Sequence, residues 1–146
     1  GLDLSFSSYE DAKGQMFPSI IYSLRGANLS EANLSGINMD QIDARGANFY
    51  KTDLLGALFR DSKLQNANFY GANLKGANLY RSNLSGADFR AADLVLADIT
   101  STSTRGTAWD SAICPNGLMT DSSPCLPLSE KNQPQSISLI PQLIAA

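Results

Sequence analysis

Histidine is absent from this chain of 146 residues, which has only two cysteines and one tryptophan. Without an imidazole, the chain lacks the side chain that most often serves as a general base or a metal ligand near neutral pH. Charged residues make up 17% of the chain and its net charge is −3, too small a charge to indicate the sign of a partner. These absences argue against an enzyme, and we expect no catalytic residue, metal site or cofactor.

Long apolar runs are also missing. The first residues, Gly1-Leu2-Asp3-Leu4, have neither the basic start nor the apolar run of a signal peptide. The most apolar stretch, ISLIPQLIAA at 137–146, is short and interrupted by Pro141, so it cannot span a bilayer. We therefore expect a soluble chain without membrane insertion, of a length that suits one domain, and compatible with the mature part of a longer precursor.

What the chain does have is a five-residue repeat, visible in GANLKGANLYRSNLSGADF at 71–89. A large apolar residue, here called the centre, recurs every five positions. A small residue stands two places before it, Asn or Asp lies between them, and Gly often follows two places later. The centres are Leu24, Leu29, Leu34, Met39, Ala44, Phe49, Leu54, Phe59, Leu64, Phe69, Leu74, Leu79, Leu84, Phe89, Leu94 and Ile99. A helix would scatter the centres around its axis and a strand would send them to alternate faces, so neither explains the repeat.

A chain that turns a corner every five residues does explain it. If each pentad is one side of a square coil, the centre and the small residue point inward. The Asn or Asp points outward, where a short polar side chain can bond nearby backbone groups, and Gly permits the corner. Four sides predict a second period of twenty. Phe49, Phe69 and Phe89 have that spacing, with Leu29 before them and Trp109 after, and should form a column inside the coil.

This pattern of Ala, then Asn or Asp, then Leu or Phe resembles the pentapeptide-repeat family over residues 22–109. The resemblance rests on many consecutive copies of the motif. It implies an all-β solenoid, a right-handed quadrilateral β-helix of about four coils with non-repeat caps at both ends.

The two ends of the chain carry different sequence. In the N-terminal cap, residues 1–21, Ser7 and Glu10 fit a capping box, and Gly14 and Pro18 would stop a helix begun there. We therefore expect a short helix over the first coil. The C-terminal cap, residues 110–146, is rich in loop-forming Pro, Ser, Asn and Gly. Its apolar end, from Leu139 to Ala146, is expected to fold back as a lid over the last coil.

The two cysteines, Cys114 and Cys125, both lie in the C-terminal cap. A nucleophile or a metal ligand is a poor interpretation with no histidine present. A disulfide is favoured over two free thiols in a reducing cytosol, because free thiols beside Pro115 and Pro124 would be exposed and reactive. Persistent disulfides belong to oxidising compartments. Proteins resembling this family are abundant in cyanobacteria and occur in the plant thylakoid lumen, so we expect the lumen of the chloroplast thylakoid or the bacterial periplasm.

Two sets of outward residues are candidate functional sites. Asp88, Asp93 and Asp98 fall on successive sides of a coil and do not converge, so they predict no metal or catalytic site. Tyr50 and Tyr70 are twenty residues apart and should stack on the outer surface beside Arg90, one coil further on. These three residues are the expected interaction surface, although aromatic pairs across strands also stabilise sheets without binding anything.

The preferred function is a non-enzymatic structural or protein-interaction module that presents flat outer faces to a protein partner of unknown identity. The alternative is a DNA-mimic inhibitor of a DNA-binding enzyme, as the resemblance implies for some members of the family. That function needs a strongly acidic rod, whereas Lys51, Lys75, Arg81 and other cations interrupt the acids here. A nucleic-acid partner is therefore not expected, and the oligomeric state is left open.

Overall fold

The computed structural model describes residues 7–10, 16–19 and 23–129, and these ranges contain two named strands and no helix. Strands β1 (Ser7–Glu10) and β2 (Met16–Ser19) pair antiparallel. The short helix expected in the N-terminal cap is therefore wrong. The capping-box residues both lie in β1, and the aromatic residues Tyr9 in β1 and Phe17 in β2 favour strands. Pro18 pairs opposite Ser8, which a two-stranded sheet tolerates because both strands are edges.

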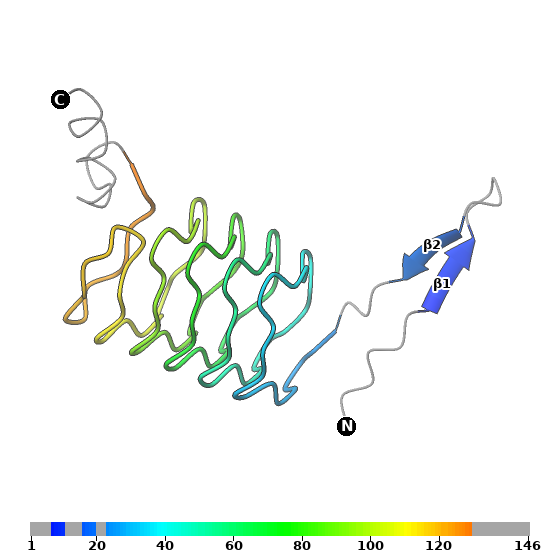
Figure 1. Cartoon of the computed structure of the whole chain (residues 1–146), viewed down its shortest axis with the longest axis horizontal. Helices are drawn as coiled ribbons and strands as arrows, with labels where there is room; N and C mark the ends of the chain where they lie inside the picture. Colours follow the sequence, from blue (N-terminus) through cyan, green and yellow to red (C-terminus); the bar gives the residue numbers. More distant parts are fainter. Residues whose placement is uncertain (1–6, 11–15, 20–22, 130–146) are drawn as a thin grey trace.

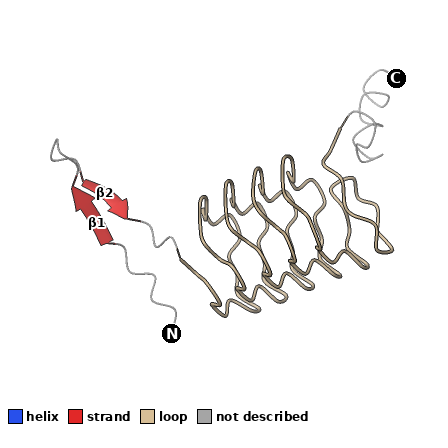
Figure 2. Ribbon diagram, turned by 180° about the vertical axis from the view of Figure 1, so that it is seen from behind, coloured by secondary structure: helices blue, strands red, loops and turns tan. Residues whose placement is uncertain are grey.

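From Ser23 onward the chain winds into coils that stack side by side (Figures 1 and 2). Every parallel bridge, from Ser23 with Asp43 to Asp93 with Ile113, joins residues twenty positions apart. Each coil therefore takes twenty residues on four sides, and the fold is a right-handed quadrilateral β-helix of somewhat more than four coils. The pairing continues to Ile113, beyond the expected boundary of the repeats at residue 109.

Each corner is a tight turn of one kind. The N–H of Ala27 donates to the carbonyl of Leu24 at 3.0 Å, and the same bond recurs along the coils. The residue before the closing N–H has a left-handed backbone, whether it is Gly76 (φ 63°) or Leu96 (φ 61°). A positive φ at the third position of a four-residue turn is the signature of type II. Glycine adopts this conformation without strain, whereas other residues pay a steric cost.

The core lies inside the coils and consists of the centres with their small partners. Most of these side chains are fully buried. The predicted aromatic column is present: the ring centroids of Phe49 and Phe69 lie 4.8 Å apart, those of Phe69 and Phe89 4.7 Å, and those of Phe89 and Trp109 5.0 Å. The rings are near parallel because successive coils place the same position at the same point, one strand spacing apart.

The last coil ends in a return of the chain on itself. Ile113 pairs antiparallel with Met119, so one side of the coil is covered by the segment that follows it. A disulfide then joins Cys114 to Cys125, whose Cα atoms are 5.2 Å apart. The lid expected from Leu139 to Ala146 lies outside the described residues.

Candidate interaction surface

The space inside the coils is occupied by protein. The apolar side chains pack against one another, and polar side chains that point inward bond the backbone of the neighbouring coil. Thr52 Oγ1 donates to the carbonyl of Leu29 at 2.8 Å, and Ser62 Oγ to that of Met39 at 3.0 Å. These buried hydroxyls are therefore satisfied by the fold. A binding partner would therefore contact the outer faces of the coils or their ends.

Tyr50, Tyr70 and Arg90 occupy the same corner position on three successive coils, and we call them the aromatic strip. The two tyrosine rings stack with centroids 5.7 Å apart at an interplanar angle of 17°. The guanidinium carbon of Arg90 lies 5.7 Å from the Tyr70 ring, and the ammonium of Lys51 lies 5.2 Å from the Tyr50 ring. The strip is thus two stacked rings with a cation near each.

A row of polar side chains beside the strip holds its backbone in place. Asn48 Oδ1 accepts the N–H of Tyr50 at 3.1 Å, and Asn68 Oδ1 accepts that of Tyr70 at 3.0 Å. The two amides are also joined, since Asn68 Nδ2 donates to Asn48 Oδ1 at 3.1 Å. The backbone of both tyrosines is therefore held by hydrogen bonds to this row.

Asp88 is the third member of this row, and it anchors the cation of the strip. Its carboxylate accepts two bonds from the Arg90 guanidinium, at 2.9 and 2.7 Å. The Arg90 side chain is the main reason that the pKa of Asp88 lies below its usual value. Asp88 in turn raises the pKa of Arg90. The pair fixes Arg90 in a position that faces Tyr70.

The strip is accessible to a partner. Tyr70 is 37% exposed and Arg90 is exposed as well. Tyr80, which lies outside the strip, is exposed to a similar degree, 38%. It lies two corners further along the coil than Tyr70 and belongs to no ring stack in the described ranges. Tyr80 therefore offers a natural comparison for any experiment on the strip.

The structure does not bring together the three aspartates that the sequence offered as a second candidate site. Asp88, Asp93 and Asp98 lie on successive sides, and each accepts a backbone N–H two residues on, as Asp98 does from Thr100 at 2.9 Å. Within the described residues, no group of three or more His, Cys, Asp or Glu side chains could hold a metal ion. The same part of the chain has no helix of the length and hydropathy needed to cross a membrane.

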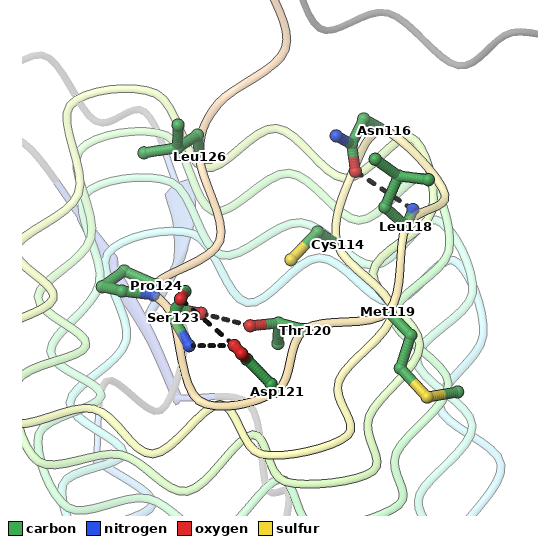
Figure 3. Close-up of a pocket in the computed structure, with 9 residues that line it drawn as sticks. All are labelled: Cys114, Asn116, Leu118, Met119, Thr120, Asp121, Ser123, Pro124 and Leu126. Atoms are coloured by element: carbon green, nitrogen blue, oxygen red, sulfur yellow. Dashed lines mark hydrogen bonds between the residues drawn. The ribbon is translucent and has the colours of Figure 1, made fainter.

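Sequence reasoning missed two features. The first is Lys51 beside Tyr50, for which the only signal was its place directly after a corner tyrosine. The second is a hollow of about 430 Å³ at the C-terminal end of the coils (Figure 3). Three strongly exposed apolar side chains, Leu118, Met119 and Leu126, line it. They lie outside the repeats, so no period marked them.

Comparison with known proteins agrees with this architecture. Residues 22–89 match the family described as the pentapeptide repeat region. No curated protein sequence shows significant similarity to the chain.

Several solved structures are similar. Rfr23, a pentapeptide repeat protein of the cyanobacterium Cyanothece 51142, is 22% identical, with 51% of this chain and 58% of that one covered and a TM-score of 0.45. HetL, a pentapeptide repeat protein involved in heterocyst differentiation regulation in Nostoc sp. strain PCC 7120, is 28% identical, with 67% and 47% covered and a TM-score of 0.51. One from the thylakoid lumen of Arabidopsis thaliana is 28% identical, with 80% and 76% covered and a TM-score of 0.41. The chain therefore spans about half the length of the first two.

Proposed function

Because the chain belongs to the pentapeptide-repeat family, we propose that it is a non-enzymatic module that binds a protein partner through the aromatic strip. The family includes HetL, whose role is in regulation. The chain offers no histidine, and its described residues bring no catalytic set together. The outer faces then remain for function, and the aromatic strip brings two stacked rings and two cations together there.

The single observation that carries the proposal is the rigid presentation of Tyr70. Its ring stacks on Tyr50 on one side and meets Arg90 on the other. Tyrosine and arginine are the residue types most often found at the energetic centre of protein interfaces. A side chain already held in place loses little further conformational entropy on binding. The strip therefore combines suitable residues with a low cost of ordering.

The test compares Tyr70→Ala with Tyr80→Ala, which removes a similarly exposed ring from another corner. Partners are captured on the immobilised chain from an extract of its source organism, identified by mass spectrometry and then measured one at a time. We expect Tyr70→Ala to weaken partner binding by about tenfold or more, as for an interface hot spot. Tyr80→Ala should leave the affinity unchanged. Equal affinities for the two variants would refute the strip as the binding surface.

The alternative, a DNA-mimic inhibitor, has less support. Among the described residues, five aspartates make ion pairs with neighbouring cations, including Asp40 with Arg60, Asp61 with Arg81 and Asp93 with Lys75. Paired carboxylates do not present the continuous negative field of a nucleic-acid backbone. We expect no effect of the chain on DNA supercoiling by a topoisomerase, and inhibition in that assay would favour the alternative.

We also propose that the protein works in an oxidising compartment, the thylakoid lumen or a bacterial periplasm. The support is the disulfide between Cys114 and Cys125, both of which are buried. Such bonds rarely persist in a reducing cytosol.

A further inference from the structure

One of the four sides of the β-helix carries an excess of cations. Its segments, at 23–26, 42–46, 62–66, 82–86 and 102–106, are stacked by parallel bridges between residues twenty positions apart. We call it the basic side, because Arg25, Arg45, Lys63 and Arg105 stand there against a single carboxylate, Asp43. On each of the other three sides, followed to residue 111, carboxylates outnumber cations. The net charge of −3 for the whole chain therefore does not describe this side.

The three arginines of the basic side share one position in the coil, each directly before a corner glycine. Backbone bonds bring these corners together: the N–H of Gly26 donates to the carbonyl of Arg45 at 3.0 Å, and that of Gly86 to the carbonyl of Arg105 at 2.9 Å. Arg25, Arg45 and Arg105 therefore lie in one column along the axis of the coils. Four coil spacings of about 4.8 Å give the column a length of about 19 Å.

Most of the positive charge on this side is unpaired. Arg25, Lys63 and Arg105 are exposed, and none of them makes an ion pair within the described residues. The carboxylate of Asp43 is already bound, since it accepts two bonds from the Arg45 guanidinium. Arg45, with a smaller contribution from Arg25, holds the pKa of Asp43 well below its usual value. Asp43 therefore stays ionised and engaged with Arg45.

The cations of the other three sides already have neighbours. Four of them form an ion pair with an aspartate: Arg60, Lys75, Arg81 and Arg90. The fifth, Lys51, lies 5.2 Å from the ring of Tyr50. Among the described residues of the coils, the cations that have neither an ion pair nor a ring beside them are thus all on the basic side.

The outward side chains of the basic side decide which kind of partner fits it. All of them are polar or charged, apart from the glycines. Stable attachment to an anionic membrane needs an inserted apolar group besides so few cations, and single-stranded nucleic acid is held largely by stacking on aromatic rings. An acidic polypeptide needs neither. An extended strand rises about 3.3 Å per residue, so about six residues span the column, and arginine binds carboxylates through two parallel hydrogen bonds.

We propose that the basic side binds an acidic segment of a partner protein, extended along the axis of the coils. Arg25 and Arg105 bind carboxylates at the two ends of the segment, and Lys63 binds a carboxylate between them. These carboxylates take the place that aspartates of the chain itself have beside the cations of the other sides. The surface is separate from the aromatic strip, which lies one corner further along each coil.

Fluorescence anisotropy with a labelled peptide of six glutamates, and with a peptide of six glutamines for comparison, tests the proposal at about 20 mM salt. The variant loses the unpaired cations of the basic side through Arg25→Gln, Lys63→Gln and Arg105→Gln together. The matched control loses the same charge from cations that have aspartate partners, through Arg60→Gln, Lys75→Gln and Arg81→Gln. Circular dichroism checks that both keep the fold, which exposed polar changes should not disturb.

We expect the wild type and the control to bind the glutamate peptide and not the glutamine peptide. The variant should bind the glutamate peptide about tenfold more weakly or less, because three exposed ion pairs are lost while its net charge equals that of the control. Raising the salt to about 150 mM should weaken binding by the wild type, because exposed charges are screened.

Three results would overturn the proposal. The first is equal binding of the two peptides by the wild type, or binding that salt does not change. The second is equal affinity of the variant and the control for the glutamate peptide. The third is tighter binding of the wild type to vesicles with about 30% phosphatidylserine, or to single-stranded DNA, that is lost in the variant. Tyr70→Ala should bind the glutamate peptide as the wild type does, so this proposal and that of the aromatic strip fail separately.

Discussion

Adjacent residues at a corner of the coil have opposite environments. Phe69 is fully buried between Phe49 and Phe89, whereas Tyr70 is 37% exposed on the outer face. Replacing Phe69 by Ala should lower the free energy of unfolding by about 3–5 kcal/mol, the range for a buried phenylalanine. Replacing Tyr70 by Ala should cost about 1 kcal/mol or less, the worth of an exposed ring pair. Urea denaturation gives both values, and similar losses would show that the inward assignment is wrong.

Backbone strain at the corners is a second property of single residues. Ala91 and Gly76 both have left-handed φ angles, 57° and 63°, and no atom lies within 4 Å of the position that a Cβ on Gly76 would take. Gly76→Ala should therefore destabilise the fold by about 1–2 kcal/mol through backbone strain alone. Ala91→Gly should stabilise it, by about 0.5–1 kcal/mol after the entropy cost of glycine. Thermal or chemical unfolding of the pair should show shifts of opposite sign, and two shifts in the same direction would contradict the turn geometry.

Within one side of the coil and its corner, an ion pair makes the stability of the fold depend on acid pH. Arg45 binds both oxygens of Asp43, at 2.8 and 2.6 Å, and this bond is the main cause that lowers the pKa of Asp43 from 3.8 to about 2. Because the folded-state pKa lies below the unfolded-state value, the pair stabilises the fold above about pH 4, and its contribution disappears as the pH falls toward 2.

Asp43→Asn should therefore lose less stability than the wild type when the pH falls through this window. Arg45→Gln should behave in the same way, since it removes the cause of the lowered pKa. The measurement is the free energy of unfolding at several pH values between about 5 and 2. An acid dependence of Asp43→Asn identical to that of the wild type would show that the pair has no such role.

The same scale shows why some elements could be predicted and others could not. The sides and corners follow from local rules, because each pentad repeats the same small, polar and large residues, and one fold must suit all copies. The strand Ser7–Glu10 belongs to no repeat. There the sequence offered a capping box, which is a short local signal for a helix. The aromatic residues of the two strands prefer an extended backbone, and the strand that formed pairs with Met16–Ser19.

For the whole molecule, the disulfide links structure to location. The bond between Cys114 and Cys125 closes a short loop and should contribute about 3 kcal/mol or slightly less by the chain-entropy model. Intact mass of the denatured protein, alkylated with and without prior reduction, should show two alkyl groups only after reduction. Two alkyl groups in the unreduced sample would refute the bond, and the oxidising compartment would lose its support.

The surface of the whole molecule was predictable only where it follows the repeat. The spacing of Tyr50 and Tyr70 sufficed to place them together, since one coil separates them. The hollow lined by Leu118, Met119 and Leu126 was not predictable, because it forms where the period ends and the chain turns back on itself. The sequence pattern does not identify the partner of the strip, because recognition depends on the shape and chemistry of the bound surface.

The twenty-residue register also governs how the length of such a chain can change during evolution. Loss of a single residue would turn every later side chain from the inside of the coil to the outside, as a register slip does in any sheet. Loss of five residues would keep the core intact but rotate all later corners by one side, so Tyr70 would no longer lie over Tyr50 if the deletion fell between them. Only the gain or loss of a full coil preserves both the core and the outer columns. Lineages of this protein should therefore lengthen and shorten in whole-coil units.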